Sequence, residues 1–338
     1  MAATNKTPLT PERIMQFAWA YAIPLIIESA IRNSIFDALN AGPKTIEQLA
    51  RQTKASPRGL RAVLDALVSF DLARKIGSRY RLTPESATFL VSTKPSFRGG
   101  LFKHISAHLI PSWLKLSDIV RSGRPATAAN AEKAGAKFFE EFVEDIFPMS
   151  YAAAQALGDA LKISASKGPI SVLDIAAGSG VWGIALAQKS PKVRVTAVDW
   201  PGVLPVTRRV ATRFGVASRF RYVAGDILTA DFGRDHRIAT LGHILHSEGE
   251  KRSRKLLGRV FKSLAPGGTI AIAEFTPNDD RTGPPGAMIF GVNMLVNTDT
   301  GDTYSFEEIR SWLEHAGFVN ARTLEAPGPS PLILATKP

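Results

Sequence analysis

Three aspartates in the second half of the chain follow short runs of apolar and β-branched residues, where strands are expected to end. They are Asp174, Asp199 and Asp226. Helical patterns separate the runs, so the strands should lie parallel and bring their carboxyl ends to one edge of a sheet. Carboxylates accept hydrogen bonds from hydroxyl and amino groups and attract cations. This edge is therefore the predicted site for a ligand that carries such groups.

A glycine-bearing turn follows the first strand and would form one wall of that site. It reads Asp174-Ile-Ala-Ala-Gly-Ser-Gly180, and Gly178 and Gly180 would let a ligand approach the backbone at the start of a helix. The continuation Gly178-Ser-Gly180-Val-Trp-Gly183 also matches the dinucleotide fingerprint. An acid that opens the turn opposes a pyrophosphate, however, and suits a cationic group.

The three acids together favour S-adenosylmethionine over NAD as the ligand. Asp199 is placed to accept hydrogen bonds from ribose hydroxyls, a feature that both cofactors would use. Asp226, which follows the third strand in Ala224-Gly-Asp-Ile227, could accept a hydrogen bond from the adenine amine. S-adenosylmethionine combines adenine, ribose and a positively charged amino-acid tail, and it contains no phosphate.

The alternation of strand and helix patterns from residue 170 onward predicts an α/β fold. Strands are expected over residues 170–175, 193–199, 220–224, 238–244 and 269–274, and helices over 181–188, 203–214 and 250–264. Helices between successive strands imply a Rossmann-like, doubly wound and mainly parallel sheet that is covered on both faces. Ligands bind such sheets beyond the carboxyl ends of the strands, where the three aspartates lie.

The first half of the chain shows mainly helical patterns and predicts a separate N-terminal domain. Helices over residues 45–52 and 58–70, followed by short strands over 72–76 and 80–83, describe a winged helix. Helical patterns resume over residues 97–161, and the stretch 162–169 is small and polar. We therefore predict a helical, winged-helix domain over residues 1–165 and a Rossmann-like, ligand-binding domain over residues 166–338.

The composition excludes several classes of protein. The 338 residues include no cysteine, which excludes disulfides, thiolate nucleophiles and cysteine metal sites. The longest apolar run, Ile14–Ile27, contains Pro24 and is shorter than the ~20 residues that a membrane span needs. It also lacks the preceding basic region of a secretion signal. We expect a soluble, cytoplasmic protein with no membrane partner.

The charge of the chain leaves nucleic acid open as a partner. Lys and Arg number 42 against 30 Asp and Glu, a formal net charge of +12, and a winged helix can read DNA through its second helix. The cations that could touch phosphate are Arg58, Arg61, Arg74, Lys75, Arg79 and Arg81. Basic residues recur singly along the chain, however, which favours a solvated basic face. A ligand-responsive DNA-binding protein is the alternative function.

Five short motifs, in one order along the chain, carry a resemblance to a known family. They are Val172–Gly180, Val198–Pro201, Ala224–Ile227, Leu245-His246 and Leu264–Gly268. With them the chain resembles class I S-adenosylmethionine-dependent methyltransferases over nearly its whole length. More narrowly, it resembles the small-molecule O-methyltransferases of plant phenolic and bacterial natural-product pathways, which carry an N-terminal winged-helix dimerisation domain. The resemblance implies a homodimer that uses S-adenosylmethionine, releases S-adenosylhomocysteine and methylates a hydroxyl of a small aromatic molecule.

The resemblance also implies which residues hold the cofactor. In the family, the first turn holds the methionine portion, the acid after the second strand holds ribose, and the Gly-Asp after the third strand contacts adenine. The matching cofactor-binding residues are Asp174, Gly178, Gly180, Asp199, Trp200, Asp226 and Ile227.

The family's catalytic histidine matches His246, and the acid that orients it matches Glu274. A phenol is a poor nucleophile until it is deprotonated, and imidazole is suited to take that proton near neutral pH. His243 is the reserve candidate for the base, and no metal is required. The acceptor pocket of the family matches Met288, Phe290, Asn293 and Met294, residue types that also occur in ordinary cores.

The chain departs from the family pattern at several positions. Two glycines of the first turn are replaced by Ala176 and Ala177, and Ser247-Glu248 follows the histidine where Asp-Trp is usual. Gly242 stands where a lysine is common in the family. A second glutamate, which supports the catalytic histidine in plant members, would align near Thr303, and Asp302 is adjacent to that position. These changes keep open methylation of carbon or nitrogen, and cofactor-assisted chemistry without methyl transfer.

Overall fold

The computed structural model describes residues 9–126, 132–328 and 331–338. The chain divides into two compact units, Met1–Ile110 and Pro111–Pro338. The predicted fold class is confirmed, because a mainly parallel sheet forms the second unit and helices with a small winged sheet form the first.

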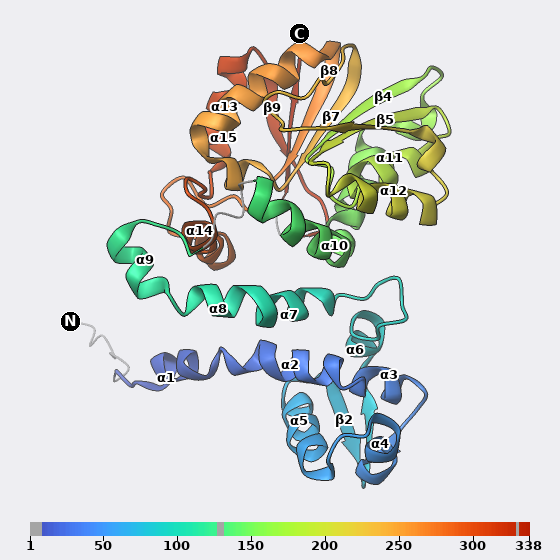
Figure 1. The fold of residues 1–338 in the computed structure, drawn as a ribbon, viewed down its shortest axis with the longest axis vertical. Coiled ribbons are helices and arrows are strands. Elements are labelled where there is room, and N and C mark those ends of the chain that lie inside the picture. The colour runs from blue at the N-terminus through green and yellow to red at the C-terminus, as the bar shows by residue number, and fades with distance from the viewer. Residues whose placement is uncertain (1–8, 127–131, 329–330) are drawn as a thin grey trace, which may run out of the picture. The chain divides into compact units, whose positions relative to one another are not determined.

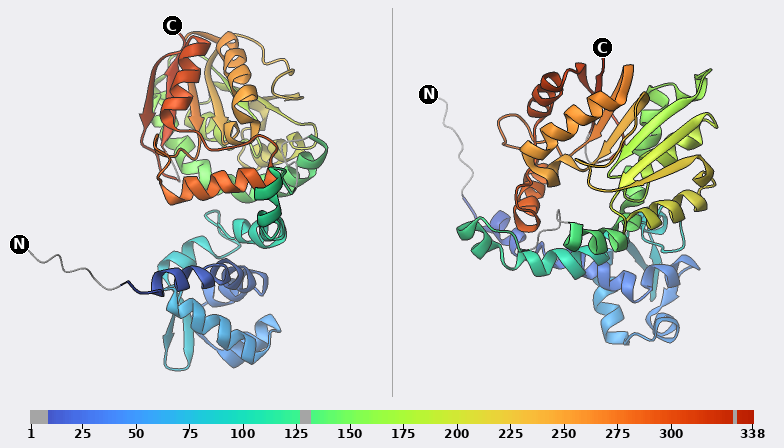
Figure 2. Two further views of the ribbon diagram at one scale, coloured as in Figure 1. Left: turned by 90° about the vertical axis from the view of Figure 1, so that its left-hand side faces the viewer. Right: turned by 45° about the horizontal axis from the view of Figure 1, so that its top comes forward.

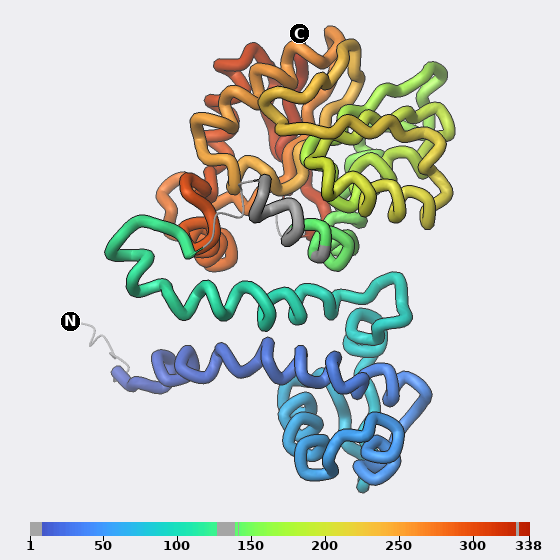
Figure 3. Tube along the Cα trace, viewed as in Figure 1, coloured from blue at the N-terminus to red at the C-terminus, as the bar shows by residue number. Residues whose placement is uncertain are grey.

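The first unit has the predicted winged-helix order of elements. Its helices α4 (Ile46–Thr53) and α5 (Pro57–Ser69) precede the hairpin of β2 (Ala73–Ile76) and β3 (Arg79–Leu82), and Figure 3 traces this course. A short strand, β1 (Lys44–Thr45), pairs with β3, so the antiparallel sheet has the order β1-β3-β2. The other elements are α1 (Glu12–Trp19), α2 (Ala22–Arg32), α3 (Ile35–Asn40), α6 (Pro84–Phe89), α7 (Gly100–His104) and the π-helix η1 (Ile105–Leu109).

Side-chain caps fix the starts of the two central helices of this unit. Thr45 and Gln48 form a reciprocal capping box at α4, and the Ser56 hydroxyl accepts a hydrogen bond from the backbone N–H of Gly59 at α5. The helices then bury one apolar face each. The leucines fully enclosed in this core are Leu49, Leu60, Leu64 and Leu67.

The apolar side chains at the start of the first unit face solvent. Ile14, Phe17, Trp19 and Tyr21 are between 62% and 72% exposed. Among the described residues, Glu12–Arg32 is the one helical stretch long and apolar enough to cross a membrane by length and composition. The helical stretch is longer than the apolar run Ile14–Ile27 that the sequence shows. The second half of that stretch, α2, buries Ile27 and Ile31 in the core of the unit, as a helix of a globular domain does.

A seven-stranded sheet forms the centre of the second unit (Figure 1). The strand order is β6-β5-β4-β7-β8-β10-β9; the first five of these lie parallel, and β10 is antiparallel to both neighbours. The strands are β4 (Ile170–Ile175), β5 (Val193–Asp199), β6 (Phe220–Ala224), β7 (His236–Gly242), β8 (Leu264–Ala273), β9 (Val319–Leu324) and β10 (Leu332–Thr336).

Helices cover both faces of this sheet (Figures 1 and 2). One face carries α10 (Glu132–Ala160), α11 (Val181–Lys189) and α12 (Leu204–Arg213), and the other carries α13 (Leu245–Ser263) and α15 (Phe306–Ala316). The remaining helical segments are α8 (Ile110–Trp113), α9 (Leu116–Ser122), α14 (Pro285–Asn297) and the short 3₁₀ turns Ile163–Ala165 and Ala217–Arg219.

The order of the strands reverses beside β4. The chain runs outward from β4 to β5 and β6, and then crosses to β7 on the other side of β4. The carboxyl ends of β4 and β7 therefore border the crevice in which doubly wound sheets bind their ligands.

The predicted domain boundary at residues 165 and 166 differs from the division in the structure, which falls between Ile110 and Pro111. The reason is α10, which packs against α11 and contributes Phe147 and Leu157 to the core of the second unit. Glu144 of α10 also forms ion pairs with Arg209 and Arg213 of α12. Helical periodicity shows that this segment buries a face, but it does not show which domain covers it.

Several elements differ in extent from their predictions. Strands β7 and β8 begin earlier than expected, and α14, α15, β9 and β10 were not predicted. Helix α13 begins at Leu245 instead of residue 250, since Gly249 is non-helical (φ 76°, ψ 161°) and joins a short first turn to the longer helix. That first turn carries His246.

Candidate cofactor and active site

A cavity lies at the carboxyl ends of the parallel strands of the second unit. Its walls come from the loops after β4, β5, β6 and β7, together with side chains of α10. Of the nine predicted site residues, six line it: Gly178, Asp199, Trp200, Asp226, Ile227 and His246. The fold thus brings most of the predicted residues together, as their places at strand ends require.

Asp199 ends β5 and is held by two backbone N–H groups. Gly178 donates to its Oδ2 at 2.7 Å, and Trp200 donates to its Oδ1 at 2.7 Å. Burial raises the pKa of this carboxyl to about 6. Each carboxylate oxygen can accept a second hydrogen bond, so Asp199 has capacity left for a pair of hydroxyls in the cavity.

In the glycine turn, the backbone of Gly178 and Gly180 can be approached closely by a ligand and by neighbouring side chains. Gly178 and Gly180 have φ values of 55° and 77°, the left-handed region that favours glycine. A Cβ on Gly180 would lie 2.9 Å from the Cγ2 atom of Thr207, whose hydroxyl donates to the Gly178 carbonyl at 2.7 Å. Gly180 therefore packs the turn against α12, while Gly178 faces the cavity.

Asp174 has a different position from the one predicted. It is fully buried and is absent from the cavity wall, and both of its oxygens are already bonded. The Thr240 hydroxyl donates to Oδ1 at 2.7 Å, and the Gly183 N–H donates to Oδ2 at 2.9 Å. Burial raises its pKa to about 7. This geometry supports a role in fixing the turn and the start of α11, instead of the predicted direct contact with the ligand.

Asp226 belongs to a charged cluster that the sequence did not reveal. Its Oδ1 accepts the Leu228 N–H at 2.7 Å, and its Oδ2 pairs with Arg252 at 2.8 Å. Arg252 also pairs with Glu248 at 2.5 Å, and Glu248 lines the cavity beside Asp226. Arg252 and Glu248 are four residues apart on α13, a spacing that signals an ion pair in any helix but does not point to this cavity.

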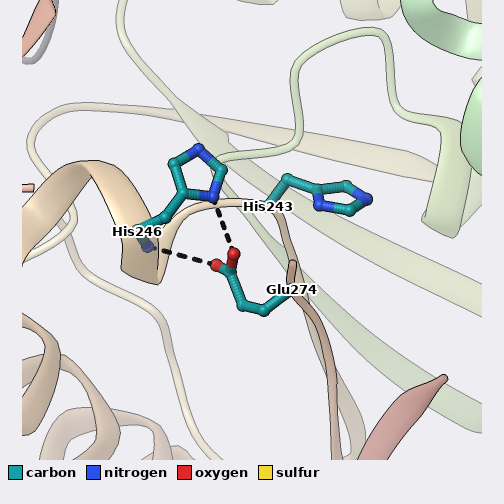
Figure 4. A group of neighbouring side chains, drawn as sticks. All are labelled: His243, His246 and Glu274. Atoms are coloured by element: carbon teal, nitrogen blue, oxygen red, sulfur yellow. Dashed lines mark hydrogen bonds and ion pairs between the residues drawn. The ribbon is translucent and has the colours of Figure 1, made fainter. Parts of the chain in front are cut away.

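His246 and Glu274 form a buried pair at the edge of the cavity (Figure 4). The Nδ1 atom of His246 lies 2.7 Å from Oε2 of Glu274, and Oε1 accepts the backbone N–H groups of Leu245 and His246. Burial raises the pKa of Glu274, but the charge of His246 and its hydrogen bonds outweigh burial and lower this pKa below its usual value. An ionised Glu274 holds the proton on Nδ1, which leaves Nε2 as the acceptor nitrogen.

His243 lacks such a partner. It has a positive φ of 61°, and its buried Nδ1 atom makes no hydrogen bond within the described part of the chain. Burial lowers its pKa to about 4. The ring points away from Glu274 in Figure 4 and packs against Phe275, with 5.0 Å between ring centroids.

The residues predicted for the acceptor pocket lie on α14, and they differ in their surroundings. Phe290 meets the His246 ring edge-on, with centroids 4.8 Å apart. Met294 is buried, Asn293 accepts a hydrogen bond from the Trp113 indole at 3.0 Å, and Met288 is half-buried. Of these four, Phe290 is the one in contact with the proposed base.

Two departures from the family pattern have a local physical cause. A Cβ at Gly242 would lie 2.0 Å from Nε1 of Trp182, so the indole occupies the space that a lysine side chain would need. Near Thr303, the backbone N–H of Asp302 donates to the His246 carbonyl at 2.9 Å. Glu274 is thus the acid that contacts the imidazole, while Asp302 holds the backbone behind it.

The alanines that replace glycines in the first turn predict a measurable difference in stability. Ala176 has a φ of 50°, a conformation that costs an L-residue about 1–2 kcal/mol, whereas Ala177 has no positive φ. We expect Ala176→Gly to raise the free energy of unfolding by about 0.5–1 kcal/mol, and Ala177→Gly to lower it by a similar amount. Urea denaturation of both variants would check this, and equal effects of the two substitutions would contradict it.

Comparison with protein families identifies the family of the chain. The profile of the O-methyltransferase domain matches residues 113–319, and that of the O-methyltransferase dimerisation domain matches residues 15–92. The 3-hydroxy-5-methyl-1-naphthoate 3-O-methyltransferase of Streptomyces sahachiroi is 28% identical over 92% of this chain and 91% of its own length. The tetracenomycin polyketide synthesis 8-O-methyl transferase TcmO of Streptomyces glaucescens is 27% identical over 97% of both chains.

Solved structures show the same fold. A protein from Nostoc punctiforme assigned as an O-methyltransferase is 30% identical, with a TM-score of 0.89 over 98% of this chain and 100% of that one. Human N-acetylserotonin methyltransferase in complex with S-adenosylmethionine is 22% identical, with a TM-score of 0.85 over 100% of this chain and 99% of that one. The chain belongs to the O-methyltransferase family, and it is an S-adenosylmethionine-dependent enzyme with an N-terminal dimerisation domain.

Proposed function

We propose that this enzyme methylates a phenolic hydroxyl of a small aromatic molecule, with His246 as the general base. The observation that carries the proposal is the buried His246–Glu274 pair at the wall of the cavity, with 2.7 Å between Nδ1 and Oε2. Glu274 orients the ring and stabilises the imidazolium that forms when Nε2 takes a proton.

The groups that line the cavity suit the cofactor. S-adenosylmethionine, when bound, supplies the electrophilic methyl group. Asp199 would accept the ribose hydroxyls, Gly178 allows close approach of the methionine portion, and Asp226 and Ile227 lie where the adenine is proposed. Trp200 and the small side chain of Ala177 complete an apolar wall that excludes water.

In the reaction, the chain's own residues transfer the proton and position the reactants. His246 would take the phenolic proton on Nε2, and the phenolate so formed would be the nucleophile toward the methyl group that the cofactor would supply, with the cofactor's sulfur as the leaving group. The proton ends on the His246–Glu274 pair and the product is S-adenosylhomocysteine. The displacement is in line, so the rest of the catalysis is positioning. Phe290 and Phe275, whose centroids are 4.1 Å apart, offer aromatic faces beside the base for an aromatic acceptor.

His243 is the weaker candidate for the base. A nitrogen with a pKa of about 4 has little tendency to hold a proton taken from a phenol, and the Nδ1 atom of His243 forms no hydrogen bond with an acid among the described residues. We propose that His243 lines the cavity as a neutral side chain.

The acceptor atom can be determined with matched substrates. A hydroxynaphthoate, its methyl ether and the corresponding aminonaphthoate would be incubated with S-adenosylmethionine that carries a trideuterated methyl group, and products would be identified by mass spectrometry. Oxygen methylation predicts product from the hydroxynaphthoate alone. Product from the amine, and none from the hydroxyl compound, would contradict the proposal and support N-methylation.

We expect turnover to survive complete removal of metal ions. His243, His246 and Glu274 are the described residues that could hold a cation, with ligand atoms within 4.8 Å of one another. Both oxygens of Glu274, however, already accept hydrogen bonds from His246 or its neighbour. Dialysis against a chelator should therefore leave kcat unchanged, whereas loss of activity that zinc or magnesium restores would show that the group binds an essential metal.

We propose that the enzyme works as a cytoplasmic homodimer. The dimerisation domain supports a second copy as the partner, and the exposed apolar side chains Ile14, Phe17 and Trp19 provide a surface that association would cover.

The DNA-binding alternative is not favoured by the comparisons. In the predicted wing, Lys75 pairs with Asp65, and Arg79 donates to Gln48 and to the Pro43 carbonyl, so these cations already have partners.

A further inference from the structure

Glu248 is a buried acid on the wall of the cofactor cavity, at the second position after His246, where the family usually has tryptophan. Its side chain is 5% exposed. The non-helical Gly249 fixes the backbone beside it, since a Cβ there would lie 2.7 Å from the Thr300 carbonyl oxygen. The local fold therefore holds Glu248 in place.

Arg252 ties Glu248 to the end of the cavity that Asp226 occupies. One guanidinium pairs with Oε2 of Glu248 at 2.5 Å and with Oδ2 of Asp226 at 2.8 Å. Two carboxylates share one cation, so the cluster keeps a net negative charge toward the cavity. Because Asp226 follows the third parallel strand, this cluster lies at the end of the cavity proposed for adenine.

One oxygen of the cluster has no donor among the described residues. Oδ1 of Asp226 accepts the Leu228 N–H, and Oδ2 of Asp226 and Oε2 of Glu248 accept from Arg252. No hydrogen bond to Oε1 of Glu248 is found among the described residues. Glu248 lines the cavity, so an oxygen of this carboxylate that has no donor in the protein can accept a hydrogen bond from a ligand there.

We propose that Glu248 accepts a hydrogen bond from the exocyclic amine of the cofactor's adenine and selects adenine against bases that lack this amine. The inference rests on the proposed position of S-adenosylmethionine in this cavity. An amine offers two N–H donors, whereas hypoxanthine has a carbonyl oxygen at the same place. That oxygen would face the carboxylate with no proton between them, which is a repulsive contact.

The test compares two ligands on the whole protein. S-adenosylhomocysteine and its hypoxanthine analogue, S-inosylhomocysteine, would be titrated by calorimetry into wild type, Glu248→Gln and Glu250→Gln. Glu250 is the matched control, because it lies on the same helix, pairs with Arg254 and does not line the cavity. Burial raises the pKa of Glu248, so the titration is made at about pH 8 to favour the ionised carboxylate.

We expect wild type and Glu250→Gln to prefer the adenine ligand by about 10- to 100-fold, the range for one hydrogen bond to a charged group. Glu248→Gln should reduce this preference to about threefold or less, since a glutamine amide can donate to the hypoxanthine oxygen. If Glu248 served only to hold Arg252, both ligands would weaken together and the ratio would stay unchanged. That result would overturn the inference.

The remaining outcomes are also decisive. If the wild-type protein binds both ligands equally, the inference is overturned. This measurement needs no variant, so it decides the question even if Glu248→Gln does not fold. Wild type that binds neither ligand would overturn the proposed cofactor site itself, and so the two failures are distinguishable.

Discussion

His246→Ala is expected to reduce kcat by about 10²- to 10⁴-fold, the usual contribution of a general base, and to leave the affinity for S-adenosylhomocysteine unchanged. The ring of His246 is fixed by Glu274 at 2.7 Å and lies at the edge of the cavity, and it is not among the groups proposed to hold the cofactor. Steady-state kinetics with one phenolic acceptor, together with calorimetry, would measure both quantities.

The acidity of the acceptor distinguishes a base from a structural residue. A phenol that is already ionised needs no base, so the loss caused by His246→Ala should shrink as the acceptor becomes more acidic. Glu274→Gln should lower kcat less than His246→Ala does, because the ring keeps a hydrogen-bond partner. His315→Ala, on the exposed end of α15, is the matched control and should have no effect. A loss of kcat that is equal for all acceptors would contradict the role as base.

Asp199→Ala is expected to weaken binding of S-adenosylhomocysteine by about 10²- to 10⁴-fold. Two hydroxyls would lose a charged acceptor, at about 1.5–3 kcal/mol each, and the N–H groups of Gly178 and Trp200 would lose their partner. Asp199→Asn keeps the shape and one acceptor oxygen and should cost about tenfold. Calorimetric titration of the two variants would check these values, and unchanged affinity in Asp199→Ala would contradict the position proposed for ribose.

The pH dependence of binding follows from the raised pKa of Asp199. Burial brings that pKa to about 6, so the carboxylate that accepts the hydroxyls is lost as the pH falls through that value. The ligand binds the ionised form more tightly, so its Kd should rise as the pH falls below 6, level off about tenfold higher, as in Asp199→Asn, and stay flat above pH 6. Asp199→Asn should remove this dependence, whereas a contribution from Asp174, with a pKa of about 7, would persist in that variant.

The sequence predicted the residues whose position follows from topology. Asp199 and Asp226 end parallel strands, and His246 follows the next one, so a doubly wound sheet brings them to one edge without any knowledge of side-chain packing. Their convergence on one cavity follows from the order of strands and helices along the chain.

The sequence could not predict which way a side chain turns or what distant segment covers it. Asp174 has the right place in the motif, but its carboxylate turns inward to Thr240 and Gly183. The pair of Arg252 and Asp226 joins residues from different elements, and α10 packs on a unit that its own periodicity does not identify. Such contacts depend on tertiary packing, which residue spacing alone does not encode.

The most direct test of the account is a calorimetric titration of the purified enzyme with S-adenosylhomocysteine beside NAD. The first strand is followed by a glycine turn that matches a dinucleotide fingerprint, but the described residues that line the cavity include carboxylates and neither lysine nor arginine for a pyrophosphate. We expect S-adenosylhomocysteine to bind with a Kd on the order of micromolar and NAD to give no heat. No binding of S-adenosylhomocysteine by folded protein, or binding of NAD in its place, would contradict it.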